Sequence, residues 1–111
     1  MAVVPEQAAK SSGDWSQLLL EKVVFITGAG GAIGSAIACA CASHGARVVI
    51  ADINSTAIND VKTKILEQKV TDEEHLLPIE LDVSNEESIK QAVQTVVDKW
   101  NTINVLVNKY F

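Results

Sequence analysis

A cluster of glycines between an apolar run and an alanine-rich segment constrains the fold of this sequence more than any other feature. Four of the six glycines lie within residues 28–34. The run before them, residues 23–27, carries apolar side chains on both faces and predicts a strand buried from two sides. The segment after them predicts a helix over residues 32–44, which Gly45 ends as a C-terminal cap. A tight turn of this kind brings main-chain N–H groups to a helix N-terminus, a geometry that binds phosphate groups.

Strand-like and helix-like segments alternate along the rest of the chain, as is typical of βα units and a parallel sheet. Pro78 lacks an N–H donor, which favours an edge position for its strand. Right-handed crossovers predict four strands in the order 3-2-1-4, with the first two helices on one face and the third on the other. The remaining strands are expected over residues 47–51, 75–81 and 103–108, and the remaining helices over residues 55–68 and from a capping box at residues 84–87 onward.

Each of the three predicted helices has an apolar face that should pack on the sheet. In the first helix Ile33 and Ile37 share a face, and small residues permit close approach to the sheet. The faces of the other two helices consist of Ile58, Val61 and Ile65, and of Ile89, Ala92, Val93, Val96, Val97 and Trp100. The pattern as a whole predicts an α/β fold with one core.

An acidic residue at the end of the second strand completes the pattern of a dinucleotide-binding unit. Asp52 lies 18 positions beyond Gly34 (52 minus 34), close to the spacing at which such an acid reaches a ribose. Its carboxylate can accept hydrogen bonds from both hydroxyls of an adenosine ribose, and its charge would repel a 2′-phosphate. The sequence therefore favours NAD over NADP. The alternative is that Asp52, Ile53 and Asn54 only turn the chain and cap the next helix.

The glycine loop resembles that of the short-chain dehydrogenase/reductase (SDR) family, which reads Thr-Gly-x-x-x-Gly-x-Gly. Thr27, Gly28 and Gly34 match this motif, whereas Ala32 replaces one of its glycines. A methyl group at a helix start is small, so we expect binding to survive the replacement.

Two later segments extend the resemblance, which covers residues 22–108. Leu81-Asp82-Val83 is similar to the family's Asp-Val after the third strand, and residues 105–108 resemble the start of its Leu-Val-Asn-Asn-Ala-Gly motif. The resemblance implies that Asp82 contacts the exocyclic amine of adenine and Val83 its ring. Alternatively, Asp82 only helps Ser84 to cap the next helix.

The resemblance implies a partial Rossmann (doubly wound) fold over residues 21–111, after a flexible leader over residues 1–20. It implies a nicotinamide dinucleotide as partner, and no metal site is expected. The expected cofactor-binding residues are Thr27, Gly28, Gly31, Ile33, Gly34, Asp52, Ile53, Asp82, Val83 and Asn108.

The resemblance implies that catalysis in the family needs a serine and a Tyr-x-x-x-Lys pair, in which the tyrosine acts as general acid or base. Tyr110 is the only tyrosine, and only Phe111 follows it. We therefore expect a cofactor-binding N-terminal part of an SDR oxidoreductase acting on alcohol or ketone groups, without catalysis of its own. The alternatives are an oxidoreductase that a separate C-terminal half complements, and a binding module for a full-length relative.

Composition excludes several other functions. The net charge is −5 and there is no basic run, which argues against nucleic acid as a partner. No apolar stretch is long enough for a signal peptide or a membrane span, so a soluble cytoplasmic protein is expected. Cys39 and Cys41 are expected to be small residues that fill the core or an interface. The edge of the fourth strand, over residues 105–107, is expected to be exposed and open to association.

Overall fold

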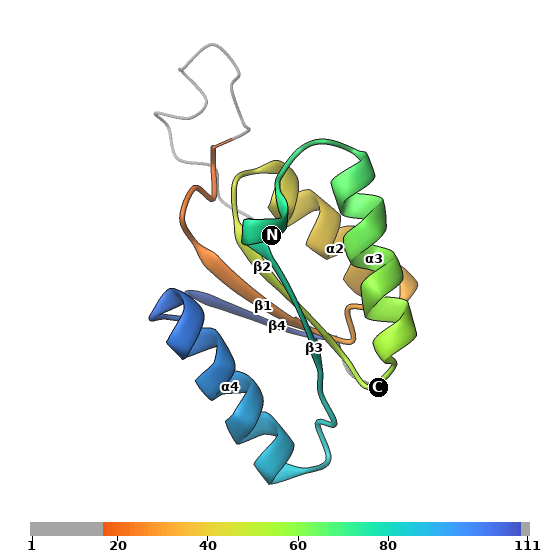
Figure 1. Cartoon of the computed structure of the whole chain (residues 1–111), viewed down its shortest axis with the longest axis vertical. Coiled ribbons are helices and arrows are strands. Elements are labelled where there is room, and N and C mark those ends of the chain that lie inside the picture. Colours follow the sequence, from red (N-terminus) through yellow and green to blue (C-terminus); the bar gives the residue numbers. More distant parts are fainter. Residues whose placement is uncertain (1–16, 110–111) are drawn as a thin grey trace.

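The computed structural model describes residues 17–109, which form an α/β fold around a four-stranded parallel sheet (Figure 1). The strands lie in the order β3-β2-β1-β4, which confirms the predicted topology. The elements along the chain are β1 (Val23–Thr27), α2 (Ala32–Ser43), β2 (Arg47–Asp52), α3 (Ser55–Glu67), the short 3-10 helix η1 (Glu73–His75), β3 (Leu76–Glu80), α4 (Glu86–Trp100) and β4 (Val105–Asn108).

The register of the strands brings their carboxyl ends to one edge of the sheet. Thr27 at the end of β1 lies opposite Ala51 of β2 on one side and Asn108 of β4 on the other. Asp52, the last residue of β2, lies opposite Glu80 of β3. Ligands of open parallel sheets bind beyond this edge, and β1 has its neighbours on both sides there.

The helices cover the sheet in two layers, with α2 and α3 on one face and α4 on the other (Figure 1). One core cluster packs α2 and α3 on the sheet, around Ile26, Ile50 and Ile65. The other packs α4 on the opposite face, around Phe25 and Trp100. All five residues of β1 are buried, as expected of a central strand between two helical layers.

The edge position predicted for β3 from Pro78 is confirmed, since β3 pairs with β2 at one end of the sheet order. The predicted inner face of α3 is also confirmed, because Ile58, Val61 and Ile65 are its buried residues. Their spacing of three and four positions places them on one side of the helix.

The inner face predicted for α2 is wrong at Ile33, whose side chain is 58% exposed. The residues that α2 buries are Gly34, Ala38 and Ala42, whereas Ile37 is only partly buried. Small side chains on this face let the helix approach the sheet closely, and this packing turns Ile33 toward solvent.

The start of α4 differs from the predicted capping box. Asn85 is the N-cap, and its side-chain oxygen accepts a hydrogen bond from the main-chain N–H of Ser88 at 3.1 Å. The hydroxyl of Ser84 donates instead to Oδ1 of Asp82, at 2.6 Å. The cap therefore lies one residue later than predicted, because Ser84 is held in the preceding turn.

The predicted apolar face of α4 is only partly buried. Ala92, Val96 and Trp100 pack in the core, but Ile89 and Val93 are each 39% exposed. These two residues line an apolar groove of about 420 Å³ together with Leu106 of β4. The helix thus presents apolar side chains in two directions, of which the sheet covers one.

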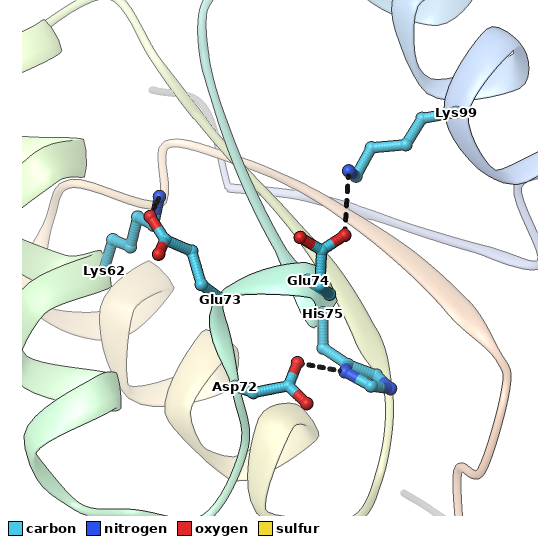
Figure 2. Close-up of polar contacts among 6 residues, drawn as sticks. All are labelled: Lys62, Asp72, Glu73, Glu74, His75 and Lys99. Carbon is cyan, nitrogen blue, oxygen red and sulfur yellow. Dashed lines mark hydrogen bonds and ion pairs between the residues drawn. The ribbon is translucent and has the colours of Figure 1, made fainter.

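Polar contacts join both helical layers to η1, at the amino end of β3 and so far from the carboxyl edge (Figure 2). Lys62 of α3 pairs with Glu73 at 3.0 Å, and Lys99 of α4 lies 3.9 Å from Glu74. Asp72 contacts Nδ1 of His75 at 2.6 Å, and this hydrogen bond holds the pKa of the Asp72 carboxyl below its usual range. Exposed pairs of this kind contribute little individually, so they mainly fix the orientation of this connection.

The leader predicted over residues 1–20 lies largely outside the described residues, as do Tyr110 and Phe111. Residues 17–20 form part of a turn, in which the main-chain N–H of Leu19 donates to the carbonyl of His44 at 2.7 Å. Within the described part of the chain, no helix has the length and apolarity needed to cross a membrane.

Candidate functional site

A cavity of about 500 Å³ opens at the carboxyl edge of the sheet, between the glycine loop and the ends of β2 and β3. Most of the predicted cofactor-binding residues line it: Thr27, Gly28, Gly31, Asp52, Ile53, Asp82 and Val83. Its other lining residues are Ala51, Leu81, Ser84 and Lys109, which the sequence did not single out as binding residues. Four segments far apart in the chain therefore form one concave surface.

Three predicted residues do not line this cavity. Gly34 lies beneath the loop, where a Cβ atom would come within 2.2 Å of the Gly28 carbonyl oxygen. Ile33 points outward on the first turn of α2, and Asn108 lines the neighbouring apolar groove. Gly34 thus acts on the site through the packing of α2 against the loop.

The glycine loop is held by main-chain contacts, within the loop and with neighbouring segments. Gly28 has a φ of +66°, a conformation that a side chain would strain, and a Cβ there would lie 2.3 Å from the main-chain oxygen of Lys109. The N–H of Ala29 donates to Ala51 at 3.0 Å, and that of Gly31 to Gly28 at 3.2 Å. These bonds fix the turn between β1 and α2.

The N-terminus of α2 is open to a ligand. Gly31 is its N-cap, with no side-chain capping bond and no acidic residue in the first turn. The first N–H groups of a helix lack intrahelical partners, and the helix dipole makes this end favourable for anions. The loop and helix together form the geometry that holds a phosphate or pyrophosphate group.

The carboxylate of Asp52 is held by two main-chain donors. Its Oδ2 accepts from the N–H of Gly30 at 2.9 Å, and its Oδ1 from the N–H of Asn54 at 3.0 Å. The cap of α3 is Asn54, whose side chain accepts from the N–H of Ala57 at 3.0 Å. Asp52 therefore does not cap the helix, although it does stabilise the turn that leads to it.

Thr27 connects β1 to β4 beneath the cavity and is the buried polar residue of this region, with 6% of its surface exposed. Its hydroxyl donates to Oδ1 of Asn108 at 2.7 Å and accepts from the main-chain N–H of Lys109 at 3.1 Å. This network holds the end of β4 against the glycine loop and orients the Asn108 side chain.

Asp82 lies at the rim of the cavity with a charged carboxylate. The hydroxyl and the N–H of Ser84 both donate to its Oδ1, at 2.6 and 3.0 Å. These hydrogen bonds, the one from the hydroxyl above all, lower the pKa of the Asp82 carboxyl. A carboxylate accepts at both oxygens, so Oδ2 remains available to a donor such as an amine.

The sequence does not reveal the roles of two residues, Gly30 and Ser84, which donate hydrogen bonds to the carboxylates of Asp52 and Asp82 at the cavity. Gly30 stands at a position that the family motif leaves open, and its contacts with Asp52 and Ala57 distinguish it from the neighbouring glycines. The sequence pattern predicts Ser84 as a helix cap, whereas its hydroxyl donates a hydrogen bond to Asp82. Among residues 17–109 no group of three or more histidine, cysteine, aspartate or glutamate side chains is placed to hold a metal ion.

Comparison with known proteins identifies similar chains. The family model described as "short chain dehydrogenase" matches residues 22–109. A short-chain dehydrogenase of Penicillium roqueforti is 37% identical over 92 residues, which are 82% of this chain and 33% of the relative. The chain spans about a third of the length of the curated relatives it matches.

Two solved structures have the same arrangement. The N-domain of a bacterial malonyl-CoA reductase with NADP matches with a TM-score of 0.77 and 28% identity, over 82% of this chain and 17% of that one. A 3-ketoacyl-(acyl-carrier-protein) reductase from Brucella melitensis complexed with NADH matches with a TM-score of 0.70 and 31% identity, over 79% of this chain and 34% of that one.

Proposed function

This chain belongs to the short chain dehydrogenase family, and from that premise we propose that its cavity binds the ADP-ribose half of a nicotinamide dinucleotide, with NAD preferred over NADP. The observation that carries the proposal is the placement of an uncapped helix N-terminus and the Asp52 carboxylate on one cavity. The first suits a pyrophosphate and the second a ribose diol, and a dinucleotide presents both groups.

The glycine loop is proposed to hold the pyrophosphate. Gly28 and Gly31 line the cavity, and Gly31 is the N-cap of α2. The first N–H groups of a helix point out of its N-terminus. Ile33, whose side chain is exposed on the first turn of α2, is proposed to flank the pyrophosphate. Gly34 supports the site from below, since its missing side chain allows α2 to pack against Gly28.

The preference for NAD is proposed to come from Asp52. Each of its oxygens accepts one main-chain hydrogen bond, and a carboxylate oxygen has a second lone pair for a ribose hydroxyl. A 2′-phosphate would bring a second negative charge to the same place, which is unfavourable in a partly desolvated cavity. The solved relatives carry NADP in one case and NADH in the other, so the preference of this chain rests on its own residues.

The adenine ring is proposed to lie between the ends of β2 and β3. Asp82 would accept a hydrogen bond from the exocyclic amine, and Val83 and Ile53 would contact the two sides of the ring. Ile53 is 63% exposed, so covering it with an aromatic ring removes apolar surface from water. Asn108 is proposed to reach the cofactor beyond the pyrophosphate, on the β4 side.

We propose that these 111 residues supply the cofactor site and not the catalysis, because they contain no Tyr-x-x-x-Lys pair. We propose that an oxidoreductase acting on alcohol or ketone groups is the activity to which this cofactor site contributes. Mixing the chain with a polypeptide that carries the serine and Tyr-x-x-x-Lys pair should produce turnover if the two halves complement each other. Turnover of an alcohol with NAD by the chain alone would contradict the proposal that these residues do not supply the catalysis.

Calorimetric titration tests the cofactor proposal directly. We expect saturable binding of NAD and of ADP-ribose and none of nicotinamide mononucleotide, because the site recognises the adenosine half. Asp52→Ala should weaken NAD binding by about tenfold through loss of charged hydrogen bonds, and should narrow the preference over NADP. Asp60→Ala, which removes an exposed carboxylate of α3, is the matched control and should leave binding unchanged. If the Asp52→Ala chain bound NAD and NADP with the same dissociation constants as the parent chain, the assignment of Asp52 to the ribose would be refuted.

The open side of β4 supports a second proposal, association with a full-length relative. Leu106 is 65% exposed and Val105 41%, and both lie on a strand at the end of the sheet order. Unpaired edges with apolar side chains favour pairing with another strand. Val105→Lys should abolish co-sedimentation with such a relative, whereas Val70→Lys, at a residue of similar exposure on another surface, should not.

A further inference from the structure

We propose that Gly30, together with Ala57 behind it, is a specificity-determining pair that positions the Asp52 carboxylate for the ribose. This inference rests on the cofactor site proposed above. It concerns a residue that makes no assigned contact with the cofactor and acts through Asp52. Gly30 is a half-buried residue of the glycine loop that lies against the first turn of α3.

The first observation is the hydrogen bond between the two segments. The N–H of Gly30 donates to Oδ2 of Asp52 at 2.9 Å, across 22 positions of sequence. A hydrogen bond to a carboxylate is stronger than one between neutral groups, so it holds the side chain firmly. The second bond, from Asn54 to Oδ1, fixes the rotation of the carboxylate.

The second observation is the space around Gly30. A Cβ at this position would lie 2.8 Å from the Cβ of Ala57 and 3.0 Å from Oδ2 of Asp52. Only a hydrogen atom fits between the two. The φ of Gly30 lies outside the left-handed region, so a side chain here meets these neighbours without backbone strain. In this respect Gly30 differs from Gly28.

The two neighbours would respond differently to an added methyl group. Ala57 belongs to the capped first turn of α3, where its N–H is bonded to Asn54, so its Cβ moves only with the helix. The Asp52 carboxylate sits on rotatable bonds at the end of β2 and gives way more easily. Gly30→Ala should therefore displace the carboxylate from the position in which its two oxygens accept from the main-chain N–H groups of residues 30 and 54.

The test compares Gly30→Ala, Ala57→Gly and the double variant with the parent chain, after circular dichroism has shown that each is folded. Gly30→Ala should weaken NAD binding by about tenfold and reduce the ratio of NADP to NAD dissociation constants. The double variant removes the closest contact and should recover part of both losses. Ala57→Gly alone should keep the parent ratio. If Gly30→Ala does not fold, the NAD affinity and the NADP-to-NAD ratio of the double variant are compared with those of Ala57→Gly.

A second readout needs no cofactor. Hydrogen exchange of the residue 30 amide should be slow in the parent chain and fast in both Asp52→Ala and Gly30→Ala. Parent binding of NAD with an unchanged NADP-to-NAD ratio in Gly30→Ala would overturn this inference alone. Failure of the parent chain to bind NAD would overturn the proposed function. If the parent chain does not bind NAD, hydrogen exchange still tests the positioning role. Fast exchange of the residue 30 amide in the parent chain would overturn that role. Slow exchange in the parent chain that becomes fast in Gly30→Ala would support it.

Discussion

Glycines that look alike in the loop sequence have different physical roles. Gly28 is needed for its left-handed backbone and for the nearby Lys109 oxygen, and Gly34 for the contact of α2 with the loop. Gly31 has only an ordinary contact, since a Cβ there would lie 3.5 Å from the Gly28 oxygen. The motif predicted which positions matter, but the distances show that Gly28 and Gly34 are constrained by the protein itself. Gly31 is free of such a constraint, which is consistent with a role toward a ligand.

A stability measurement separates these roles. Gly34→Ala should lower the free energy of unfolding by about 1 to 3 kcal/mol, because an overpacked contact with a main-chain oxygen at 2.2 Å outweighs the gain in helix propensity of up to about 1 kcal/mol. Gly31→Ala should lower it by only about 0.5 kcal/mol, because alanine is a poorer N-cap than glycine but meets no overpacked contact there. Urea denaturation of both variants checks this. A Gly34→Ala chain as stable as the Gly31→Ala chain would show that the loop is looser than described.

The elements were predictable where a local pattern decides them. Val23–Thr27 had to be a buried strand, and α3 shows its apolar stripe in sequence and structure alike. The faces of α2 and α4 were less predictable, because burial depends on the neighbours of a helix as well as on its own period. Ile33 belongs to the predicted apolar face of α2 but is exposed. Val93 belongs to the predicted apolar face of α4 but lines the open groove beside β4.

The start of α4 offers a test at this scale. Asn85→Ala should cost about 1 kcal/mol of stability, since the side chain caps the first turn. Ser84→Ala should cost less, because its hydroxyl bonds to the Asp82 side chain and not to a main-chain group of the helix. Ser84→Ala should also raise the pKa of Asp82 toward its ordinary 3.8, measured by carboxyl NMR titration. The lowered pKa stabilises the folded chain above pH 3.8, and this contribution fades as the pH falls below that value. A larger stability loss in Ser84→Ala than in Asn85→Ala would restore the predicted capping box.

At the scale of the whole molecule, the strand order and the location of the site followed from general rules. Right-handed crossovers fix the order β3-β2-β1-β4, and a switch of direction beside β1 places ligands at the carboxyl edge. What sequence could not predict are contacts between distant segments, such as Gly30 with Asp52, Thr27 with Asn108 and η1 with both helical layers. These depend on distances of a few ångströms after the sheet has assembled, and no local pattern encodes them.

The central claim is that the carboxyl edge of this sheet binds the adenosine half of NAD, and NMR titration of the nitrogen-15-labelled chain with NAD tests it most directly. The account predicts progressive amide shifts in residues 28–34, at Asp52 and Ile53 and over residues 82–84, with no shifts at Asp72 and His75 near the opposite edge. Spectra that do not change at millimolar NAD, or shifts confined to α4 and β4, would contradict it.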